Sequence, residues 1–405
     1  MNEWRKVKLG EIINILNGYS FKKEDFSEYG IPVIKIKNIK SLIVDTEDVQ
    51  FVNENFYEAK KKYRVNYKDI LLSMTGSHIS QINSVVGRVA RMKKIGKYLL
   101  NQRVAKLVSK DKKILNEDFL YYFLSQEEIT YQLALSAGGS ANQANIGNNN
   151  IYELIINLPS IFLQEKIAKI LSDIDEKIEL NNKINNNLET LCQNYFLELF
   201  IKNSSENCFN GVIADLGTIV SGATPSKKNL NYYTNVGIPW ITPKDLSKTS
   251  NKFISRGELD ISELGFRNSS VKLLPKGSVL FSSRAPIGYI AICSNEVTTN
   301  QGFKSIIPFE NIGTEFLYYF LKNNVEFLES RASGSTFKEI SSAIMSTTPA
   351  LIPKKEPLEF FKKNCSDIFK KQYTLEKENM LLTNLKNYLL PKLMNGEIDI
   401  EKIEL

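Results

Sequence analysis

The chain has 405 residues, 42% of them hydrophobic and 24% charged, with a formal net charge of +7. This length suits two or more globular domains of ordinary composition. The first residues, MNEWRKVKLGEII, contain no apolar run of signal-peptide length, and no later stretch approaches the roughly 18 uncharged apolar residues of a membrane span. These observations argue against secretion and membrane insertion, and we expect a cytoplasmic protein.

The number of cysteines and histidines and the distribution of charge narrow the possible classes of protein further. The four cysteines lie far apart and His78 is the single histidine, so neither a zinc site nor a disulfide framework is indicated, and we expect buried thiols. The positive charge is concentrated at the start, where residues 1–155 hold 23 Lys and Arg against 17 Asp and Glu. Such a surplus is compatible with nucleic acid but does not require it.

A long repeat organises the chain. Residues 118–124 read DFLYYFL and residues 315–321 read EFLYYFL, 197 positions later. Further matches flank them in the same order: GIPVIKIKNI and GIPWITPKDL, Asn101-Gln102 and Asn300-Gln301, and the closing Pro159 and Pro353. We predict a tandem duplication of two lobes, residues 1–155 and 206–352, each followed by a helical segment, residues 156–205 and 353–405.

Each lobe is predicted to mix strands and helices. GIPVIKIKNI and SVLFSS alternate apolar and polar residues as half-buried strands do, whereas EDFLYYFLSQEEITYQLA and TEFLYYFLKNNVEFLES predict short helices. In the first of these helices Phe119, Tyr122 and Phe123 share one face. That spacing is typical of core packing, with a base-stacking platform as the alternative. The predicted fold class is α+β.

The two segments that follow the lobes carry a heptad pattern. From Pro159 to about Phe200 there is no further Gly or Pro, and apolar residues recur at 4,3 spacing; adding 194 to each position yields a second seam. We predict two long helices that pair as an antiparallel coiled coil with pseudo-twofold symmetry and a lobe at each end. The predicted seam positions are Ile167, Leu171, Ile174, Ile178, Asn185, Leu188, Phe361, Ile368, Leu375, Asn379, Leu382 and Leu389.

Two asparagines in these seams suggest how the register is set. Asn185 and Asn379 occupy equivalent positions, so in an antiparallel pair with twofold symmetry they should lie close together. A buried asparagine penalises slipped registers, because these would place it against apolar partners. The alternative is that both are solvated positions on a curved helix.

Enzyme signatures are missing from the sequence. It contains no GxGxxG, GxxxxGK[ST], HExxH or GxSxG pattern, and His78 in TGSHIS fits a loop imidazole better than a catalyst. The lobes instead carry polar loops such as SMTGSHISQINSVVGR, SAGGSANQANIGNNN, GATPSKKNLNYY and SSRAPIG. Their side chains are of the types that contact base edges and phosphates, although many protein surfaces share this composition.

The order of lobe, long helix, lobe, long helix resembles the specificity subunit of Type I restriction-modification systems. Nearly the full chain takes part, through the phrases LGTIVSGATPSKKNLNYYTNVGIPWITPKDL, GSVLFSSRAPIGYIAI with TNQGF, NLPSIFLQEKIAKILSDIDEKIELNNKINNNLETL, and LLPKLMNGEIDI. The resemblance implies a non-catalytic chain with two target-recognition domains, each reading one half of a split double-stranded DNA site. The helices would set the gap between the halves and bind two modification (methyltransferase) subunits.

The resemblance also implies where cofactors belong. The assembled complex would methylate adenine at N6 with S-adenosylmethionine, and two restriction subunits, where the system has them, would cleave DNA with ATP and Mg. We expect these cofactors on the partner subunits, and neither a cofactor nor a metal on this chain. The first lobe has NGYSFKKEDF where the second has SGATPS, so the site should be asymmetric. Gln164 matches a family glutamine, whereas Leu358 stands at the matching position of the second helix, which weakens a transfer of partner contacts to that copy.

Under this resemblance we predict DNA contacts in the loops of both lobes, with the lysines as candidates for phosphate contacts. Trp240, Tyr232 and Tyr233 could equally belong to the core. In the first lobe the predicted residues are Lys35, Lys37, Asn38, Ser77, His78, Gln81, Arg88, Ser140, Asn142 and Gln143. In the second lobe they are Thr224, Lys227, Lys228, Tyr232, Tyr233, Trp240, Lys244, Ser283, Arg284, Ser335 and Lys338.

Two rival hypotheses belong to other classes. One is a self-sufficient methyltransferase or nuclease with fused recognition domains, against which the missing catalytic motifs argue. The other is a two-lobed coiled-coil DNA-binding or protein scaffold without a methyltransferase partner, which the modest charge allows.

Overall fold

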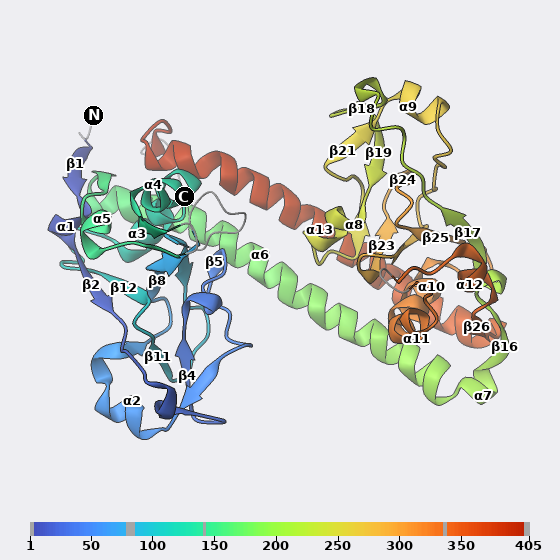
Figure 1. The fold of residues 1–405 in the computed structure, drawn as a ribbon, viewed down its shortest axis with the longest axis horizontal. Coiled ribbons are helices and arrows are strands. Elements are labelled where there is room, and N and C mark those ends of the chain that lie inside the picture. The colour runs from blue at the N-terminus through green and yellow to red at the C-terminus, as the bar shows by residue number, and fades with distance from the viewer. Residues whose placement is uncertain (1–3, 78–85, 141–142, 335–337, 401–405) are drawn as a thin grey trace. The chain divides into compact units, whose positions relative to one another are not determined.

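The computed structural model describes residues 4–77, 86–140, 143–334 and 338–400 (Figure 1). The chain divides into unit 1, residues Met1–Lys177 with Leu382–Leu405, and unit 2, residues Ile178–Leu381. We call the globular part of unit 1 lobe 1 (residues 4–158) and that of unit 2 lobe 2 (residues 208–353). Among the described helices, none is both long enough and apolar enough to cross a membrane.

The largest sheet has the same strand order in both lobes. In lobe 1 this order is β2-β12-β8-β10-β5, with bounds Ile13–Asn17, Val104–Ser109, Ile70–Ser73, Val89–Arg91 and Leu42–Ile43. In lobe 2 it is β17-β25-β22-β23-β20, with bounds Gly217–Ser221, Lys304–Pro308, Val279–Ser283, Ile287–Cys293 and Phe253–Ile254. The duplication read from the sequence is therefore a duplication of topology.

A second sheet repeats as well, except that among the described residues lobe 1 has one more edge strand, β7. Lobe 1 has β3-β6-β4-β11-β7, with bounds Phe26–Ser27, Gln50–Val52, Ile31–Ile34, Tyr98–Leu100 and Arg64–Val65. Lobe 2 has β18-β21-β19-β24, with bounds Tyr233–Thr234, Leu259–Ile261, Ile238–Ile241 and Thr298–Thr299. The remaining sheets are β1-β15 (Arg5–Lys8, Ile155–Leu158), β16-β26 (Cys208–Val212, Pro349–Pro353) and β13-β14-β9 (Gly138–Ser140, Gln143–Asn145, Thr75–Gly76).

Short helices cover these sheets. The repeated aromatic sequences form α3 (Glu117–Leu124) and α10 (Thr314–Asn323), and Asn116 caps α3 by accepting a hydrogen bond from the backbone N–H of Phe119. The other short α-helices are α1 Leu9–Ile12, α2 Asn55–Ala59, α4 Glu127–Ser136, α5 Asn148–Tyr152, α7 Ser204–Asn207, α8 Pro243–Ser247, α9 Glu263–Arg267, α11 Val325–Ser330 and α12 Ser342–Thr347.

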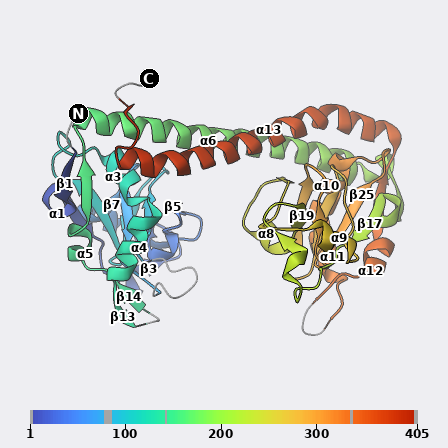
Figure 2. The same cartoon turned by 90° about the horizontal axis from the view of Figure 1, so that it is seen from above.

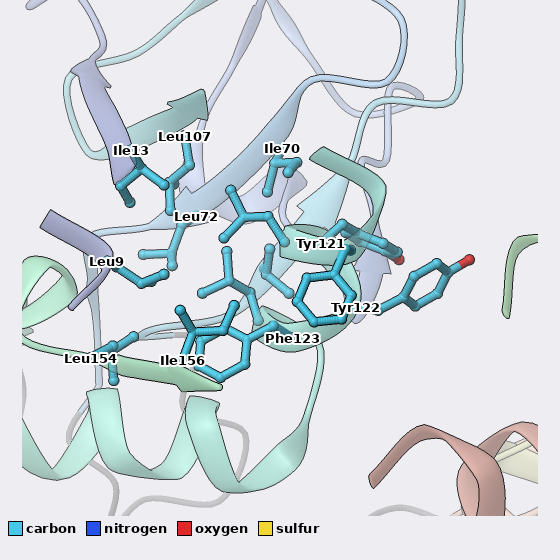
Figure 3. Close-up of a cluster of buried hydrophobic side chains, with 14 of the residues drawn as sticks. Leu9, Ile13, Ile70, Leu72, Leu107, Tyr121, Tyr122, Phe123, Leu154 and Ile156 are labelled. Atoms are coloured by element: carbon cyan, nitrogen blue, oxygen red, sulfur yellow. The ribbon is translucent and has the colours of Figure 1, made fainter. Parts of the chain in front are cut away.

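The aromatic helices belong to the cores of their lobes. In both copies of FLYYFL all six side chains are buried. Figure 3 shows Phe123 packed among aliphatic residues such as Leu72 and Ile156, with the hydroxyl groups of Tyr121 and Tyr122 pointing away from the cluster. The prediction that these aromatic residues pack in the core is confirmed. The hydroxyl group of each tyrosine can still form hydrogen bonds outside the cluster. The four cysteines are free and buried, as expected.

Two long helices follow the lobes. α6 spans Ile161–Phe196 and α13 spans Lys355–Met394, and within each unit a part of α6 lies beside a part of α13 (Figures 1 and 2). In unit 1 Asp175 of α6 forms an ion pair of 2.6 Å with Lys386 of α13. In unit 2 Asn181 of α6 donates to Asn379 of α13 at 2.9 Å. Residue numbers rise on one helix as they fall on the other, so the predicted class, duplicated α+β lobes with an antiparallel helix pair, is confirmed.

The asparagine pairing differs in detail from the prediction. All twelve predicted seam positions are buried or half-buried. However, Asn379 contacts Asn181 and Asn182, while Asn185 donates to Glu376 at 3.3 Å. Asn185 and Asn379 make these hydrogen bonds to other residues because the helix pair is shifted by about one turn from the register that would bring equivalent residues together. Asn185 and Asn379 are both half-buried, so neither is a fully solvated position.

Lobe 2 is fastened to the helix pair by a buried lysine. Lys252, which directly precedes β20, is 5% exposed and places its ammonium group 2.5 Å from Glu189 of α6. Glu189 also pairs with Lys322 at 2.6 Å and accepts a hydrogen bond of 2.9 Å from the Tyr319 hydroxyl. Burial on its own would raise the pKa of Glu189, but the two lysines outweigh it and lower the pKa to about 2. Glu189 is therefore the charged centre of this contact.

A second carboxylate completes the contact on α13. Glu376 accepts hydrogen bonds from the backbone N–H groups of Lys252 at 2.9 Å and Phe253 at 3.0 Å. Burial raises the pKa of Glu376. Since these two N–H groups lie directly before and at the first residue of β20, an edge strand of the large sheet, α13 holds that edge directly.

Lobe 1 uses the equivalent tyrosine. The hydroxyl of Tyr122 donates to Asp175 at 2.9 Å, and Asp175 pairs with Lys386. The neighbouring Tyr121 donates to the backbone carbonyl of Leu42, at the start of edge strand β5, at 3.0 Å. The aromatic repeat thus packs the core and also fastens each lobe to the long helices within its unit.

The family glutamine has an interior role. Gln164 is fully buried; its side chain accepts from the N–H of Asn116 and donates to the carbonyl groups of Ile114 and Pro159, each at 2.9 Å. Leu358 is also buried, at 3% exposure. Gln164 thus holds the segment that caps α3, and neither side chain reaches the surface.

Candidate nucleic-acid interface

The predicted lysines of lobe 1 lie just after β4. Lys35 is half-buried: its ammonium group is 3.8 Å from the centroid of the Phe26 ring and hydrogen-bonds to Gln50. Burial, followed by the nearby charge of Lys37, lowers the pKa of Lys35. Lys37 is exposed and pairs with Asp48 at 2.6 Å. Exposed pairs of this kind are weak, so Lys37 is available to a stronger anion such as a phosphate.

Lys35 stands at one end of a row of aromatic rings. Ring centroids are 6.0 Å apart for Phe26 and Phe21, 4.9 Å for Phe21 and Tyr19, and 5.4 Å for Tyr19 and Tyr63. Such contacts prefer tilted or edge-on geometry, which fixes the positions of the rings. The row gives the loops at this end of lobe 1 a rigid base.

The loop after β9 is bordered by two predicted residues. Ser77 and Arg88 are half-buried, and Arg88 lines a cavity of about 360 Å³ together with Ser41, Glu127 and Tyr131. His78, Gln81 and Asn142 lie outside the described residues. Ser140 and Gln143 pair with each other across β13 and β14, and their side chains are also outside the described part of the structure.

In lobe 2 the predicted residues gather around the loop after β17. The Thr224 hydroxyl donates to the side chain of Gln301, and Lys227 and Lys228 are exposed on the turn that follows. The hydroxyl of Tyr233 donates to the carbonyl of Pro225 at 2.6 Å, while Tyr232 is half-buried. These contacts hold the turn in place and leave its two lysines facing solvent.

A second group lies at the end of β22. Arg284 and Lys304 both approach Glu339, at 3.3 Å and 3.4 Å. Lys338 is exposed, and Ser335 lies outside the described residues. Lys244 is exposed as well and pairs with Glu258 at 3.1 Å. Arg284 and Lys304 therefore share one carboxylate, Glu339, while Lys244 is partly balanced by another, Glu258.

Three predicted contacts lie in the interior instead. Asn38 is 1% exposed, accepts from the N–H of Lys35 and donates to the carbonyl of Asp48. Ser283 is fully buried and donates to the carbonyl of Gly302. Trp240 is 6% exposed and donates to the carbonyl of Ala223, which corresponds to the core alternative stated for this residue. Because their polar groups are already bonded inside the lobe, direct contact with a base or phosphate is not available to them.

The DNA contacts predicted from the sequence do not include a strongly basic surface of lobe 1. The segments KKKYRVNYK (residues 60–68) and RMKKIGK (residues 91–97) contain nine Lys and Arg and no acid. Their runs of positive charge could have been recognised in the sequence, but 22 residues separate them, and only the pairing of β7 with β11 shows that they lie together.

No metal site is indicated in the part of the chain that the structure describes, because it contains no group of three or more His, Cys, Asp or Glu that could hold a metal ion.

Comparisons with known proteins identify the protein family to which this chain is similar. The family model for the Type I restriction modification DNA specificity domain matches residues 1–190 and 210–387, so both halves of the repeat are covered. The chain is 43% identical over 146 residues to the Type I restriction enzyme MjaIX specificity subunit of Methanocaldococcus jannaschii, an alignment of 36% of this chain and 34% of that protein.

Two further relatives extend over the whole chain. The Type I restriction enzyme HindI specificity subunit of Haemophilus influenzae is 24% identical, with 98% of this chain and 100% of that protein aligned. The crystal structure of a Type I restriction-modification system S subunit from M. genitalium has the same fold, with a TM-score of 0.65 at 17% identity and 96% of each chain covered. The chain therefore belongs to the family of Type I restriction-modification DNA specificity proteins.

Proposed function

We propose that this chain is the DNA-reading subunit of a Type I restriction-modification complex. The carrying observation is that two lobes with one strand order present different exposed side chains at their loops. Lobe 1 has Lys35 and Lys37 beside an aromatic row, whereas lobe 2 has Lys227 and Lys228 on a turn braced by Tyr233. Since direct readout depends on side-chain type at base edges, the two lobes read different half-sites and the complete site is asymmetric.

The helix pair links two lobes that each bind DNA weakly into one binding unit. Each lobe alone contacts few bases, and linking two binding modules makes the second contact intramolecular, so affinity depends on both lobes engaging one DNA molecule. The same helices present surface to two modification subunits, which hold S-adenosylmethionine and methylate adenine at N6. ATP and Mg belong to restriction subunits, where the system includes them. The chain itself performs recognition and no catalytic step.

The direct test is to express the chain with its modification subunit and map N6-methyladenine across the host genome. We expect methylation at one divided motif with two unlike halves. The matched control is the purified chain with DNA and S-adenosylmethionine but no partner, for which we expect no methyl transfer. Methylation by the chain alone, or an undivided motif in the complex, would contradict the proposal.

A further inference from the structure

The two basic segments of lobe 1 form one surface. β7 and β11 pair antiparallel, with Val65 opposite Tyr98, and the backbone N–H of Lys68 donates to the carbonyl of Met92 at 2.8 Å. The residues after β7 therefore lie beside those before β11. The basic patch, as we name it, consists of Lys60, Lys61, Lys62, Lys68, Lys94 and Lys97.

The charge of this patch is not balanced locally. All its lysines except the half-buried Lys60 are exposed, and within the described residues none of the six forms an ion pair. The two nearest acids in the sequence are already used, since Glu58 pairs with Arg64 at 2.8 Å and Asp69 with Lys106 at 3.0 Å. Unbalanced cations on one face create a positive potential that attracts polyanions.

Aromatic rings hold the patch next to the predicted interface. The ammonium group of Lys60 lies 4.2 Å from the centroid of Tyr19, which belongs to the aromatic row that ends at Lys35. Lys97 lies 5.5 Å from the centroid of Tyr57. Cation-aromatic contacts orient the lysine stems without neutralising their charge. The patch is thus continuous with the side of lobe 1 to which the loop lysines belong.

The backbone at Lys68 adds an independent observation. Lys68 has φ +69°, a left-handed conformation that is unfavourable for residues with a side chain. The same turn occurs in lobe 2, where Gly277 has φ +88° and its N–H donates to the carbonyl of Cys293 at 2.8 Å. The turn itself is best served by glycine, so packing does not account for the lysine, and strain of this kind points to a functional requirement.

We propose that the basic patch binds phosphates of duplex DNA beside the half-site that lobe 1 reads, independently of base sequence. This inference rests on the proposed function. The matching segments of lobe 2, residues 269–277 and 292–297, contain only Lys272 and Lys276 with one acid, Glu296. Phosphate anchoring by this surface is therefore unequal, and lobe 1 makes more of these contacts than lobe 2.

The test uses two variants in the complex with the modification subunit: K61Q/K62Q and K68G. Binding to the methylated motif and to random duplex DNA is measured as a function of salt concentration. Releasing counterions from each phosphate contact contributes about 0.9 to the slope of log K against log salt, so we expect the slope to fall by about 2 for the double variant and by about 1 for K68G. The loss should be equal for specific and random DNA, with the motif unchanged.

K68G separates function from folding. Removal of the left-handed lysine should raise the midpoint temperature of thermal unfolding by about 2 °C while binding weakens. The control is K113Q, an exposed lysine of the same lobe outside the patch, for which we expect no change in slope.

Unchanged slopes in both patch variants, with normal motif methylation by the wild type, would overturn the proposal. Loss of the modification subunit from the variants in size-exclusion chromatography would also overturn it, because the patch would then be a protein-docking surface. If the wild-type complex itself shows no preferred DNA motif, the proposed function fails, and the salt slopes on random DNA still decide whether the patch binds phosphates.

Discussion

In both lobes the equivalent tyrosine donates a hydrogen bond to a carboxylate of α6, but the cations that pair with this carboxylate differ. In lobe 1 Tyr122 donates to Asp175, whose ion pair comes from Lys386 of the opposite long helix. In lobe 2 Tyr319 donates to Glu189, whose ion pairs come from Lys252 and Lys322 of the lobe itself. Buried shape and hydrogen bonding are common to both copies, whereas the placement of charge differs. The exposed surfaces differ in the same sense, because the basic patch has little counterpart in lobe 2.

The strongest way to break this comparison is to remove each carboxylate. Glu189→Ala leaves Lys252, at 5% exposure, without its charged partner, and we expect unit 2 to lose about 3 kcal/mol of stability. Asp175→Ala likewise leaves Lys386, at 9% exposure, without its charged partner in unit 1, and we expect unit 1 to lose a similar amount of stability. Each variant should affect only its own unit.

The two tryptophans permit this measurement unit by unit. Trp4 belongs to unit 1 and Trp240 to unit 2. In a Trp4→Phe background, the fluorescence of Trp240 during urea unfolding reports on unit 2, and the reverse background reports on unit 1. Equal destabilisation of both units by Glu189→Ala would show that the contact is not local to lobe 2.

Acid should weaken unit 2 through Glu189. The folded-state pKa of about 2 lies below the ordinary value of 4.5, so this stabilisation is fully present above pH 4.5 and is lost as the pH falls toward 2. The contribution amounts to roughly 3 kcal/mol. We expect the unfolding free energy of unit 2 to fall more between pH 5 and pH 3 in the wild type than in Glu189→Gln, measured through Trp240. Identical pH profiles would contradict the assignment.

Removing the tyrosine hydroxyl groups tests the feature common to both lobes. Tyr319→Phe and Tyr122→Phe each delete one hydrogen bond to a carboxylate without changing the ring, and we expect each to cost about 1 to 2 kcal/mol. Tyr121→Phe is a useful comparison, because its hydroxyl bonds to the neutral carbonyl of Leu42 and its loss should cost less. A larger effect for Tyr121→Phe in urea unfolding would show that the carboxylate contacts are not the stronger ones.

The smallest expected effect on DNA binding comes from giving lobe 2 the lysine of lobe 1. Gly277→Lys places a side chain at φ +88° and brings its Cβ to about 3.0 Å from Thr314 Oγ1, so we expect unit 2 to lose about 1 to 2 kcal/mol. If the position alone decides DNA binding, the variant should gain salt-dependent affinity for random DNA. With only Lys272 and Lys276 nearby, we expect the gain in slope to stay below 1.

Much of the architecture could be predicted from the sequence because it rests on periodic patterns. The heptad spacing of Ile167, Leu171 and Ile174 indicated the long helix, and the spacing of Phe119, Tyr122 and Phe123 indicated a buried face. Pairing details were less accessible. The shift that brings Asn379 to Asn181 depends on how two helices pack, and heptads alone do not encode it.

The candidate interface was predicted less well, for a physical reason. Asn38 and Ser283 are residue types that contact DNA, but the same side chains also cap turns and bond to carbonyl groups, and sequence does not distinguish these uses. Lys252 lies in a polar stretch of the sequence. It is nevertheless buried, because its counter-ion is Glu189 of α6, which is 63 residues away in the sequence. The basic patch likewise exists only once β7 and β11 have paired.

The division of the chain also has a consequence for its synthesis. Leu390, Leu393 and Met394 share one core with Leu9 and Ile167, so unit 1 draws on both ends of the chain, whereas unit 2 is continuous in sequence. A ribosome adding about 5 to 20 residues per second needs on the order of 10 to 40 s to make the roughly 200 residues between the two parts of unit 1. Unit 2 is thus complete before the core of unit 1 can close, and the half that is made first is the half that finishes folding last.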